Sequence, residues 1–113
     1  LKKIAQEQQV TLTFFQSNHE GALIDYLQEN RTKVDGILIN PGAFTHYGYG
    51  LRDALSDTKL PIIEVHLSNI LEREEFRKTD VIEDIVIERI MGLKEQSYVQ
   101  GLEKLIAHIK QNK

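Results

Sequence analysis

The sequence predicts an α/β fold in which a parallel sheet is covered by helices on both faces. Apolar segments of strand length alternate with amphipathic segments along the chain, as is typical of parallel sheets. Residues 34–40 and 60–65 are nearly continuous hydrophobic runs, as expected of strands buried on both faces. Polar residues follow both runs at once, which places a candidate ligand site at the carboxyl edge of the sheet.

The first predicted strand covers residues 10–15, where β-branched and aromatic side chains alternate with polar ones. A helix is expected next, because Ser17 and Glu20 have the spacing of a capping box with the serine as N-cap. This helix is expected to end near Asn30. Its apolar face consists of Leu23, Ile24 and Leu27.

Two more strands and a helix follow. The strand over residues 34–40 is expected to end at Pro41, since proline cannot donate a ladder hydrogen bond. A helix is expected over residues 47–56, and the next strand over residues 60–65. The helix is expected to turn Leu51, Ala54 and Leu55 inward.

The last third of the chain is less regular. Residues 67–79 are rich in charge and are expected to be irregular. A fourth strand is predicted over residues 85–91, although Glu88 and Arg89 are unusual inside such an apolar run. A closing helix over residues 97–110 carries one apolar stripe, made of Tyr98, Leu102, Leu105 and Ile109.

Composition restricts the class of protein. The 113 residues suit one domain, expected over residues 1–113, and 41% hydrophobic and 27% charged residues are ordinary for a globular protein. A net charge of −3 gives no basic excess for nucleic acid, and no apolar run is long enough to span a membrane. The lack of cysteine fits a reducing, cytoplasmic setting. The sequence also lacks metal-ligand spacing and phosphate-binding loops.

Glu64 and His66 form the best acid–base candidate. Residues two apart on a strand project from the same face, about 6–7 Å apart along the chain. A carboxylate beside an imidazole orients the ring and favours its protonated form, as a general acid requires. The alternative is an exposed pair, but an apolar strand favours burial, where an unpaired carboxylate is costly.

Three other features have two interpretations each. The turn at residues 67–69 could form an anion-binding nest or be a simple polar turn. Asn40 could present its amide to a ligand or serve only the turn that follows. Arg73 and Arg77, four residues apart, could bind a carboxylate or belong to a solvated, charged loop.

Taken together, several short motifs resemble those of type II 3-dehydroquinate dehydratase, in that family's order and spacing. The resemblance covers roughly residues 10–77 and continues more loosely to the end of the chain. The motifs lie at residues 16–21, 39–46, 51–54, 64–69 and 73–77.

The resemblance implies a flavodoxin-like three-layer fold and a lyase without metal or cofactor. Members of the family convert 3-dehydroquinate to 3-dehydroshikimate in the shikimate or quinate pathway, and so serve aromatic amino acid biosynthesis. They eliminate water in the anti sense through an enolate. They assemble as trimers, usually four of them in a homododecamer.

The resemblance also implies roles for individual residues. His66 matches the general acid that protonates the departing C1 hydroxyl, and Glu64 matches the carboxylate that orients it. Asn40 and the backbone amides of Leu67 and Ser68 match the groups that hold the substrate carboxylate.

Four further positions match the family's binding residues. His46 and Arg77 match groups that hold the ring hydroxyls, and Arg73 matches an arginine of the active-site region. Asp53 matches an acid that reaches across the trimer interface toward a neighbouring site.

The chain departs from the family at its start. The family's first strand, an Asn-Gly-Pro-Asn-Leu-Asn segment, and a lid with an arginine and the tyrosine base have no counterpart in the sequence. Its tyrosines match no lid position: Tyr26, Tyr47, Tyr49 and Tyr98. The helical spacing of Leu1, Ile4 and Ala5 fits the end of a helix. We therefore expect the chain to be N-terminally truncated and to lack a central strand.

Two explanations of these departures remain open. The chain could be a fragment of an enzyme, or a degenerate copy that binds ligand or oligomerises without catalysis. The second gains weight from Lys78, Thr79 and Asp80, which stand where the family tends to have His and Ser. Glu88 and Lys94 stand where it tends to have glycine.

Overall fold

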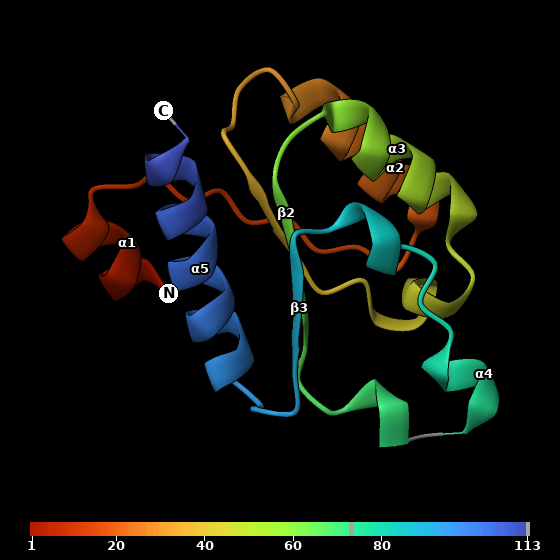
Figure 1. The fold of residues 1–113 in the computed structure, drawn as a ribbon. Helices are drawn as coiled ribbons and strands as arrows, with labels where there is room; N and C mark the ends of the chain where they lie inside the picture. Colours follow the sequence, from red (N-terminus) through yellow and green to blue (C-terminus); the bar gives the residue numbers. More distant parts are fainter. Residues whose placement is uncertain (73, 113) are drawn as a thin grey trace.

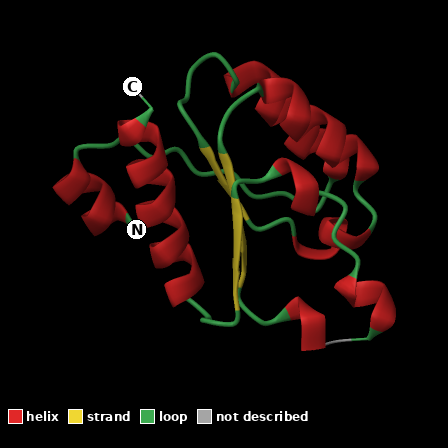
Figure 2. Cartoon of the chain, in the orientation of Figure 1, coloured by secondary structure: helices red, strands yellow, loops and turns green. Residues whose placement is uncertain are grey.

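The computed structural model describes residues 1–72 and 74–112, with Arg77 described by its backbone alone, and it has three layers. The middle layer is a parallel sheet of β1 (Ile37–Ile39), β2 (Ile62–His66) and β3 (Glu88–Met91), in the order β1-β2-β3. Figure 2 shows these strands between two layers of helices. The predicted parallel α/β class is confirmed.

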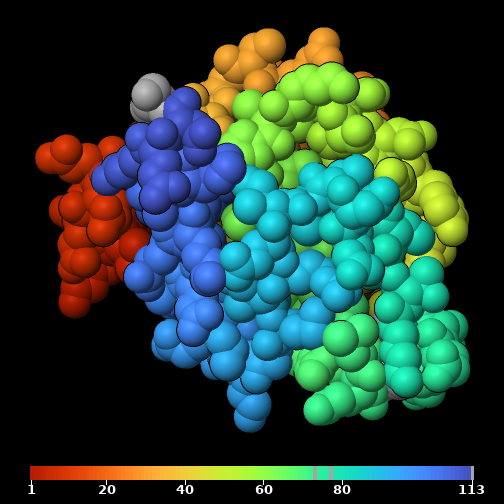
Figure 3. Space-filling model, in the orientation of Figure 1, coloured from red at the N-terminus to blue at the C-terminus, as the bar shows by residue number. Residues whose placement is uncertain are grey.

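Helices cover both faces of the sheet. On one face lie α2 (Glu20–Asn30) and α3 (Tyr49–Thr58), and on the other lie α1 (Lys2–Gln8) and α5 (Gln96–Gln111) (Figure 1). Figure 3 shows α1, in red, packed against the blue C-terminal helix. The short helices are η1 (Gly42–His46), η2 (Ile70–Glu72), α4 (Glu75–Lys78) and η3 (Glu83–Ile85). None of the helices in the described part of the chain is both long and apolar enough to cross a membrane.

The alternation of side chains along β2 divides the core in two. All five residues of this central strand are buried. Ile62 packs with the α3 side chains, whereas Ile63 and Val65 pack with α5. The first cluster consists of Leu51, Leu55, Ile62, Val81 and Ile82. The second consists of Ile63, Val65, Ile90 and Leu105. Glu64 and His66 lie two and four residues after Ile62, so their side chains leave the same face of β2 and project toward the first cluster.

The predicted strand over residues 10–15 is wrong. This segment has no strand assignment, and Phe14 and Phe15 are 60% and 46% exposed. β-branched and aromatic residues form a strand only where a neighbouring strand completes their hydrogen bonds, and no such partner lies beside this segment in the described chain. The segment instead borders an open groove of about 1320 Å³, whose other wall includes Leu38 of β1 and residues of α5.

The predicted capping box is also wrong. Helix α2 begins at Glu20 with His19 as its N-cap, while the Ser17 hydroxyl accepts a hydrogen bond from the His19 amide at 3.0 Å. The carboxylate of Glu20 accepts a hydrogen bond from the backbone amide of Leu51 at 2.8 Å. Glu20 therefore satisfies one of the open amides at the start of α3, and joins the two helices.

The other predicted elements form with shifted ends. The strand expected over residues 34–40 is reduced to β1, and the one expected over residues 85–91 to β3. β3 tolerates two charged residues because Glu88 is exposed and pairs with Lys104 at 2.9 Å, while Arg89 has acidic partners. The helices expected over residues 47–56 and 97–110 are α3 and α5, with the expected inward residues buried or half-buried.

Gly101 of α5 gives a test of the packing between this helix and the sheet. A Cβ atom at this position would lie 2.7 Å from Val65 Cγ1 and 2.7 Å from Leu38 Cδ1, and a valine on a strand cannot turn its methyl groups away easily. We expect Gly101→Ala to lower the free energy of unfolding in urea by about 1–2 kcal/mol, although alanine favours helices by about 1 kcal/mol.

Gly21→Ala in α2 is the matched control, because nothing lies within 4 Å of the added methyl group. It should leave stability unchanged or raise it by up to about 1 kcal/mol. A Gly101→Ala protein as stable as the wild type would show that α5 does not pack this closely.

Candidate active site

The carboxyl ends of β1 and β2 bring the predicted polar residues to one edge of the sheet. The two strands are parallel, with Ile39 opposite Glu64. Asn40 therefore follows β1 at the level where β2 approaches its last residue, His66. Leu67 and Ser68 continue from β2 at the same edge. The register thus gathers the candidate residues predicted from two separate segments.

Glu64 and His66 form a buried pair on this edge. Their side chains are 0% and 6% exposed, and Nε2 of His66 lies 2.5 Å from Oε2 of Glu64. The prediction that both project from one face is confirmed by this contact. Because Glu64 holds Nε2, the ring orientation is fixed and Nδ1 is the nitrogen that remains for another partner.

Burial shifts the pKa of both groups toward their neutral forms. Loss of water is the main cause that raises the pKa of Glu64, with Asp80 and Arg89 opposing it, and the same loss lowers the pKa of His66. Asp80 opposes the shift on His66, whereas Arg89 adds to it. The expectation that a neighbouring carboxylate favours imidazolium is thus countered by burial, which leaves His66 readier to give up a proton.

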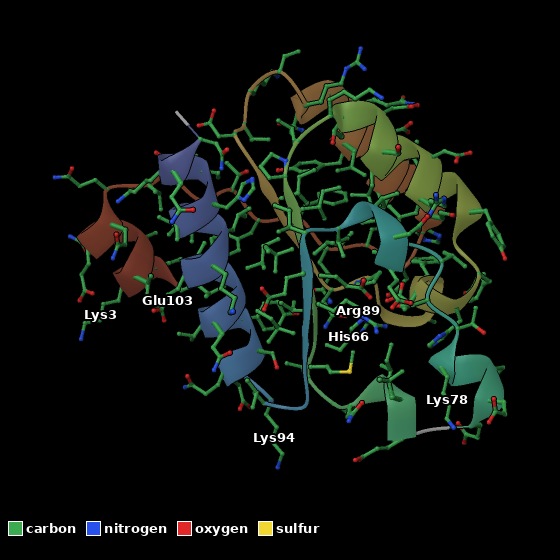
Figure 4. The ribbon with its side chains drawn as sticks, in the orientation of Figure 1. Lys3, His66, Lys78, Arg89, Lys94 and Glu103 are labelled. Atoms are coloured by element: carbon green, nitrogen blue, oxygen red, sulfur yellow. The ribbon has the colours of Figure 1, made fainter. Side chains whose placement is uncertain are left out.

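Asp80 and Arg89 extend the pair into a larger polar cluster. Oδ2 of Asp80 lies 3.3 Å from Nη1 of Arg89, and the Asp80 side chain is completely buried. Nη2 of Arg89 also lies 3.1 Å from Oε1 of Glu83. Burial, followed by the nearby Glu64 carboxyl, raises the pKa of Asp80 to about 7. Figure 4 shows Arg89 and His66 in the same region of the molecule.

Asp80 and Arg89 are not among the predicted site residues. Asp80 was noted as a departure from the family, and Arg89 as unusual in an apolar strand. An arginine in a strand that should be buried was the available signal, since such a charge requires an acidic partner.

The side-chain amide of Asn40 is held at both ends. Its Oδ1 accepts a hydrogen bond from the Gly42 amide at 3.1 Å, and its Nδ2 donates to the hydroxyl of Tyr98 at 3.0 Å. Asn40 therefore serves the turn and is also oriented by α5, and its contact with a ligand stays a prediction. Tyr98 was predicted only as part of an apolar stripe, and its hydroxyl has this additional role.

His46 lies in η1 and contacts the segment that leads to Asp80. Its Nδ1 lies 2.8 Å from the carbonyl oxygen of Thr79, and its ring meets Phe76 edge-on with centroids 6.3 Å apart. A carbonyl oxygen can only accept, so Nδ1 carries a proton. Nε2 of a neutral His46 is consequently an acceptor, which suits a ligand hydroxyl.

The turn after β2 borders a shallow hollow of about 550 Å³. The Asn69 side chain accepts a hydrogen bond from the Leu71 amide at 3.0 Å, and the Leu67 carbonyl accepts one from the Lys94 amide at 2.9 Å. The first bond closes the turn itself, and the second holds the turn against the segment that follows β3. The hollow is lined by Leu67, Ser68, Asn69, Glu72, Met91, Gly92 and Lys94.

Three predicted site residues are not placed in this cluster. Arg73 lies outside the described residues, and Arg77 belongs to α4 by its backbone, its side chain not being described. Asp53 is exposed on α3 and is not part of the buried group of Glu64, His66 and Asp80.

The same buried group has the composition of a weak metal site. One ligand atom from each of Glu64, His66 and Asp80 lies within 4.8 Å of the others. The guanidinium of Arg89 lies against Asp80, however, and already supplies a positive charge there. A cation would be repelled by Arg89, so the cluster fits proton chemistry better than metal binding.

Comparisons with known proteins agree with the resemblance seen in the sequence. Residues 1–106 match the model of the family described as dehydroquinase class II. The chain is 57% identical over 97 residues to a 3-dehydroquinate dehydratase of Roseiflexus castenholzii, covering 86% of this chain and 62% of that protein. It is 46% identical over 107 residues to that of Bacillus subtilis, covering 95% and 72%.

Solved structures give the same result. A type II dehydroquinase from Butyrivibrio crossotus superposes with a TM-score of 0.88 at 42% identity, covering 92% of this chain and 73% of that one. One from Propionibacterium acnes has a TM-score of 0.86 at 31% identity, covering 93% and 77%. The expected flavodoxin-like architecture is confirmed, and the chain spans only part of the length of these relatives.

The raised pKa of Asp80 predicts a specific dependence of stability on pH. A carboxyl with a pKa near 4 in the unfolded chain and about 7 in the folded protein takes up a proton on folding between those values. Its contribution to stability is therefore lost as pH rises through this window.

We expect the free energy of unfolding, measured in urea, to fall between pH 5 and pH 8 by about 1–2 kcal/mol more in the wild type than in Asp80→Asn. Equal pH dependence in the two proteins would contradict the raised pKa of Asp80.

Proposed function

Because the chain belongs to the class II dehydroquinase family, we propose that it carries the acid and substrate-binding part of a 3-dehydroquinate dehydratase. The observation that carries the proposal is the buried pair of His66 and Glu64 at the carboxyl edge of the sheet. A histidine fixed by a carboxylate, with one ring nitrogen left over, suits proton donation to a departing hydroxyl.

The proposed reaction is an anti elimination of water through an enolate. A base removes a proton from C2 of 3-dehydroquinate, and the electron pair forms the enolate with the C3 carbonyl. His66 then gives a proton to the C1 hydroxyl, which leaves as water while the C1–C2 double bond forms. Glu64 orients His66 during this step. The resemblance gives the role of the base to a lid tyrosine, which none of the chain's tyrosines matches.

Substrate binding is proposed to use both strand ends. Asn40, with its amide oriented by Tyr98, and the backbone amides of Leu67 and Ser68 would hold the substrate carboxylate. The support is that these groups follow adjacent parallel strands at one edge, which is where ligands bind in sheets of this kind.

The ring hydroxyls are proposed to meet cationic and acceptor groups. His46 would accept a hydrogen bond from a ring hydroxyl at Nε2, because its Nδ1 donates to the Thr79 carbonyl. Arg77 would donate to a second hydroxyl, and Arg73 would serve the same region, both on the basis of the family resemblance.

We also propose that the protein is a cytoplasmic enzyme and that it assembles as trimers and dodecamers. The exposed position of Asp53 on α3 is compatible with its proposed contact with a neighbouring subunit. Sedimentation of the purified chain tests the assembly directly.

The alternative is a homologue that binds the ligand or oligomerises without catalysing the reaction. One observation favours it: Lys94, where the family tends to have glycine, has a φ of 51°, in the left-handed region. A costly residue next to the candidate site would be tolerated more easily where catalysis is not required.

The first experiment mixes the purified chain with 3-dehydroquinate and follows the ultraviolet absorbance of the conjugated product, with binding measured by calorimetry. Turnover supports the enzyme. Binding without turnover supports an acid and binding half that needs a base from elsewhere. A chain that neither binds nor turns over 3-dehydroquinate would contradict the proposal.

His66→Ala tests the acid. In a version of the protein that turns over 3-dehydroquinate, we expect kcat to fall by about 10²–10⁴-fold, the usual contribution of a general acid, while calorimetry still detects bound substrate. His108→Ala on α5 is the matched control and should leave kcat unchanged. An unchanged kcat in His66→Ala would exclude the acid role.

Arg77→Ala tests the binding of the ring hydroxyls and needs no turnover. We expect Kd for 3-dehydroquinate to rise by about tenfold or more, since a charged hydrogen bond contributes about 1.5–3 kcal/mol. Lys78→Ala is the control, because Lys78 is adjacent on α4 and pairs with Glu75 at 3.3 Å. If both variants bind as the wild type does, Arg77 does not touch the substrate.

A further inference from the structure

Two buried carboxyl groups lie side by side behind His66. Glu64 comes from β2, and Asp80 comes from the segment after α4. Both side chains are 0% exposed, and their carboxyl oxygens lie within 4.8 Å of each other and of a His66 nitrogen. Two buried carboxylates at such a distance cannot both be ionised without a large cost, and one of them commonly keeps a proton.

The charges around this group show how many protons it needs. Arg89 contributes one positive charge, and two ionised carboxylates would contribute two negative ones. One additional proton makes the buried cluster neutral, which burial strongly favours. That proton can reside on His66 or on the carboxyl pair, because Glu64 contacts His66 and lies within 4.8 Å of Asp80.

The remaining charged groups near Asp80 lie farther out. Glu83 pairs with the outer nitrogen of Arg89, and His46 reaches the backbone of Thr79. Arg52 of α3 binds the carbonyl of Val81 and the exposed carboxylate of Asp84. These groups already have partners, so the net charge of the buried cluster depends on Glu64, His66, Asp80 and Arg89 alone.

The hydrogen bonds of the two carboxyls indicate where the proton lies. Oε2 of Glu64 meets His66, and the two oxygens of Asp80 meet the Ile82 amide at 3.1 Å and Arg89 at 3.3 Å. Oε1 of Glu64 is buried and has no hydrogen-bond donor within the described part of the chain. A carboxylate only accepts, so a proton between Asp80 and Glu64 would supply this oxygen with the partner it lacks.

We propose that Glu64 and Asp80 share one proton, and that Asp80, fixed by Arg89, is a positioning residue that sets the protonation of His66. The kinetic consequence rests on the proposed function, but the sharing itself does not. To act as an acid, His66 must carry a proton on each ring nitrogen, because Nε2 donates to Oε2 of Glu64; this form arises when the additional proton resides on the imidazole and both carboxyls are ionised. Transfer of the Nδ1 proton to the leaving hydroxyl then leaves a neutral imidazole, still bonded through Nε2–H to Glu64, with two carboxylates beside Arg89.

The test is a pH titration of the His66 ring by NMR, for which turnover is not needed. In the wild type, we expect the ring signals to shift in two steps, because His66 and the carboxyl pair titrate together. In Asp80→Asn, the amide would donate to Oε1 of Glu64, and the whole negative charge would lie on Glu64. The His66 pKa should then stay or rise, and the titration should become a single step.

The opposite sign overturns the proposal. If both carboxyls are ionised in the wild type, Asp80→Asn removes a full negative charge near His66, and the His66 pKa must fall. Asp84→Asn, which removes an exposed carboxylate paired with Arg52, is the matched control and should leave the His66 titration unchanged. If Asp80→Asn does not fold, Asp80→Ser provides the same comparison.

A metal ion is the competing occupant, and the same signals test it. Equimolar Zn²⁺ should leave the His66 signals unchanged, with EDTA as the reference. A saturable shift on adding Zn²⁺ that is absent in Asp80→Asn would assign the cluster to metal binding and overturn proton sharing.

Kinetics separates this inference from the proposed function. If the chain turns over 3-dehydroquinate, the pH profile of kcat should lose an inflection near neutral pH in Asp80→Asn. If the chain neither binds nor turns over 3-dehydroquinate, the proposed function fails, but the NMR result still decides whether the proton is shared. A wild-type kcat profile retained in Asp80→Asn would contradict the positioning role.

Discussion

The burial of Glu64 in the central strand is the constraint on which much of the structure depends. β2 has a neighbouring strand on each side and helical layers above and below, so its side chains lose contact with water. A carboxyl in such a place destabilises the fold unless its oxygens find partners. His66 supplies one partner from the same strand, while Asp80 and Arg89 come from later segments. The packing of the C-terminal half is thereby tied to the chemistry of the site.

The parallel register explains why the site lies at one edge. Because β1, β2 and β3 run in the same direction, the residues that follow them gather at their carboxyl ends. Asn40 emerges beside the end of β2. A hydrogen bond from the Lys94 amide to the Leu67 carbonyl holds the turn at residues 67–69 against the segment that follows β3. Secondary contacts then orient the side chains, as Tyr98 does for Asn40 and Thr79 does for His46. The site is therefore built from elements that the hydrophobic core already fixes.

Helix ends in this protein depend on residues that are distant in sequence. Glu20, at the start of α2, accepts a hydrogen bond from an amide near the start of α3. The carboxylate favours this position because the first turn of a helix has open amides and a partial positive charge. A local pattern such as a capping box shows that a carboxylate is available near a helix start, but not which helix it will serve.

The sequence by itself determined the α/β class, the parallel order of the two most apolar strands, the inward faces of α3 and α5, and the pairing of Glu64 with His66. These depend on periods of two and 3.6 residues and on continuous apolar runs, which are local properties. The tertiary structure alone decided that residues 10–15 do not form a strand, since a strand requires a neighbour. It also decided that Asp80 and Arg89 join the site, because only folding shows which distant charges share one buried space.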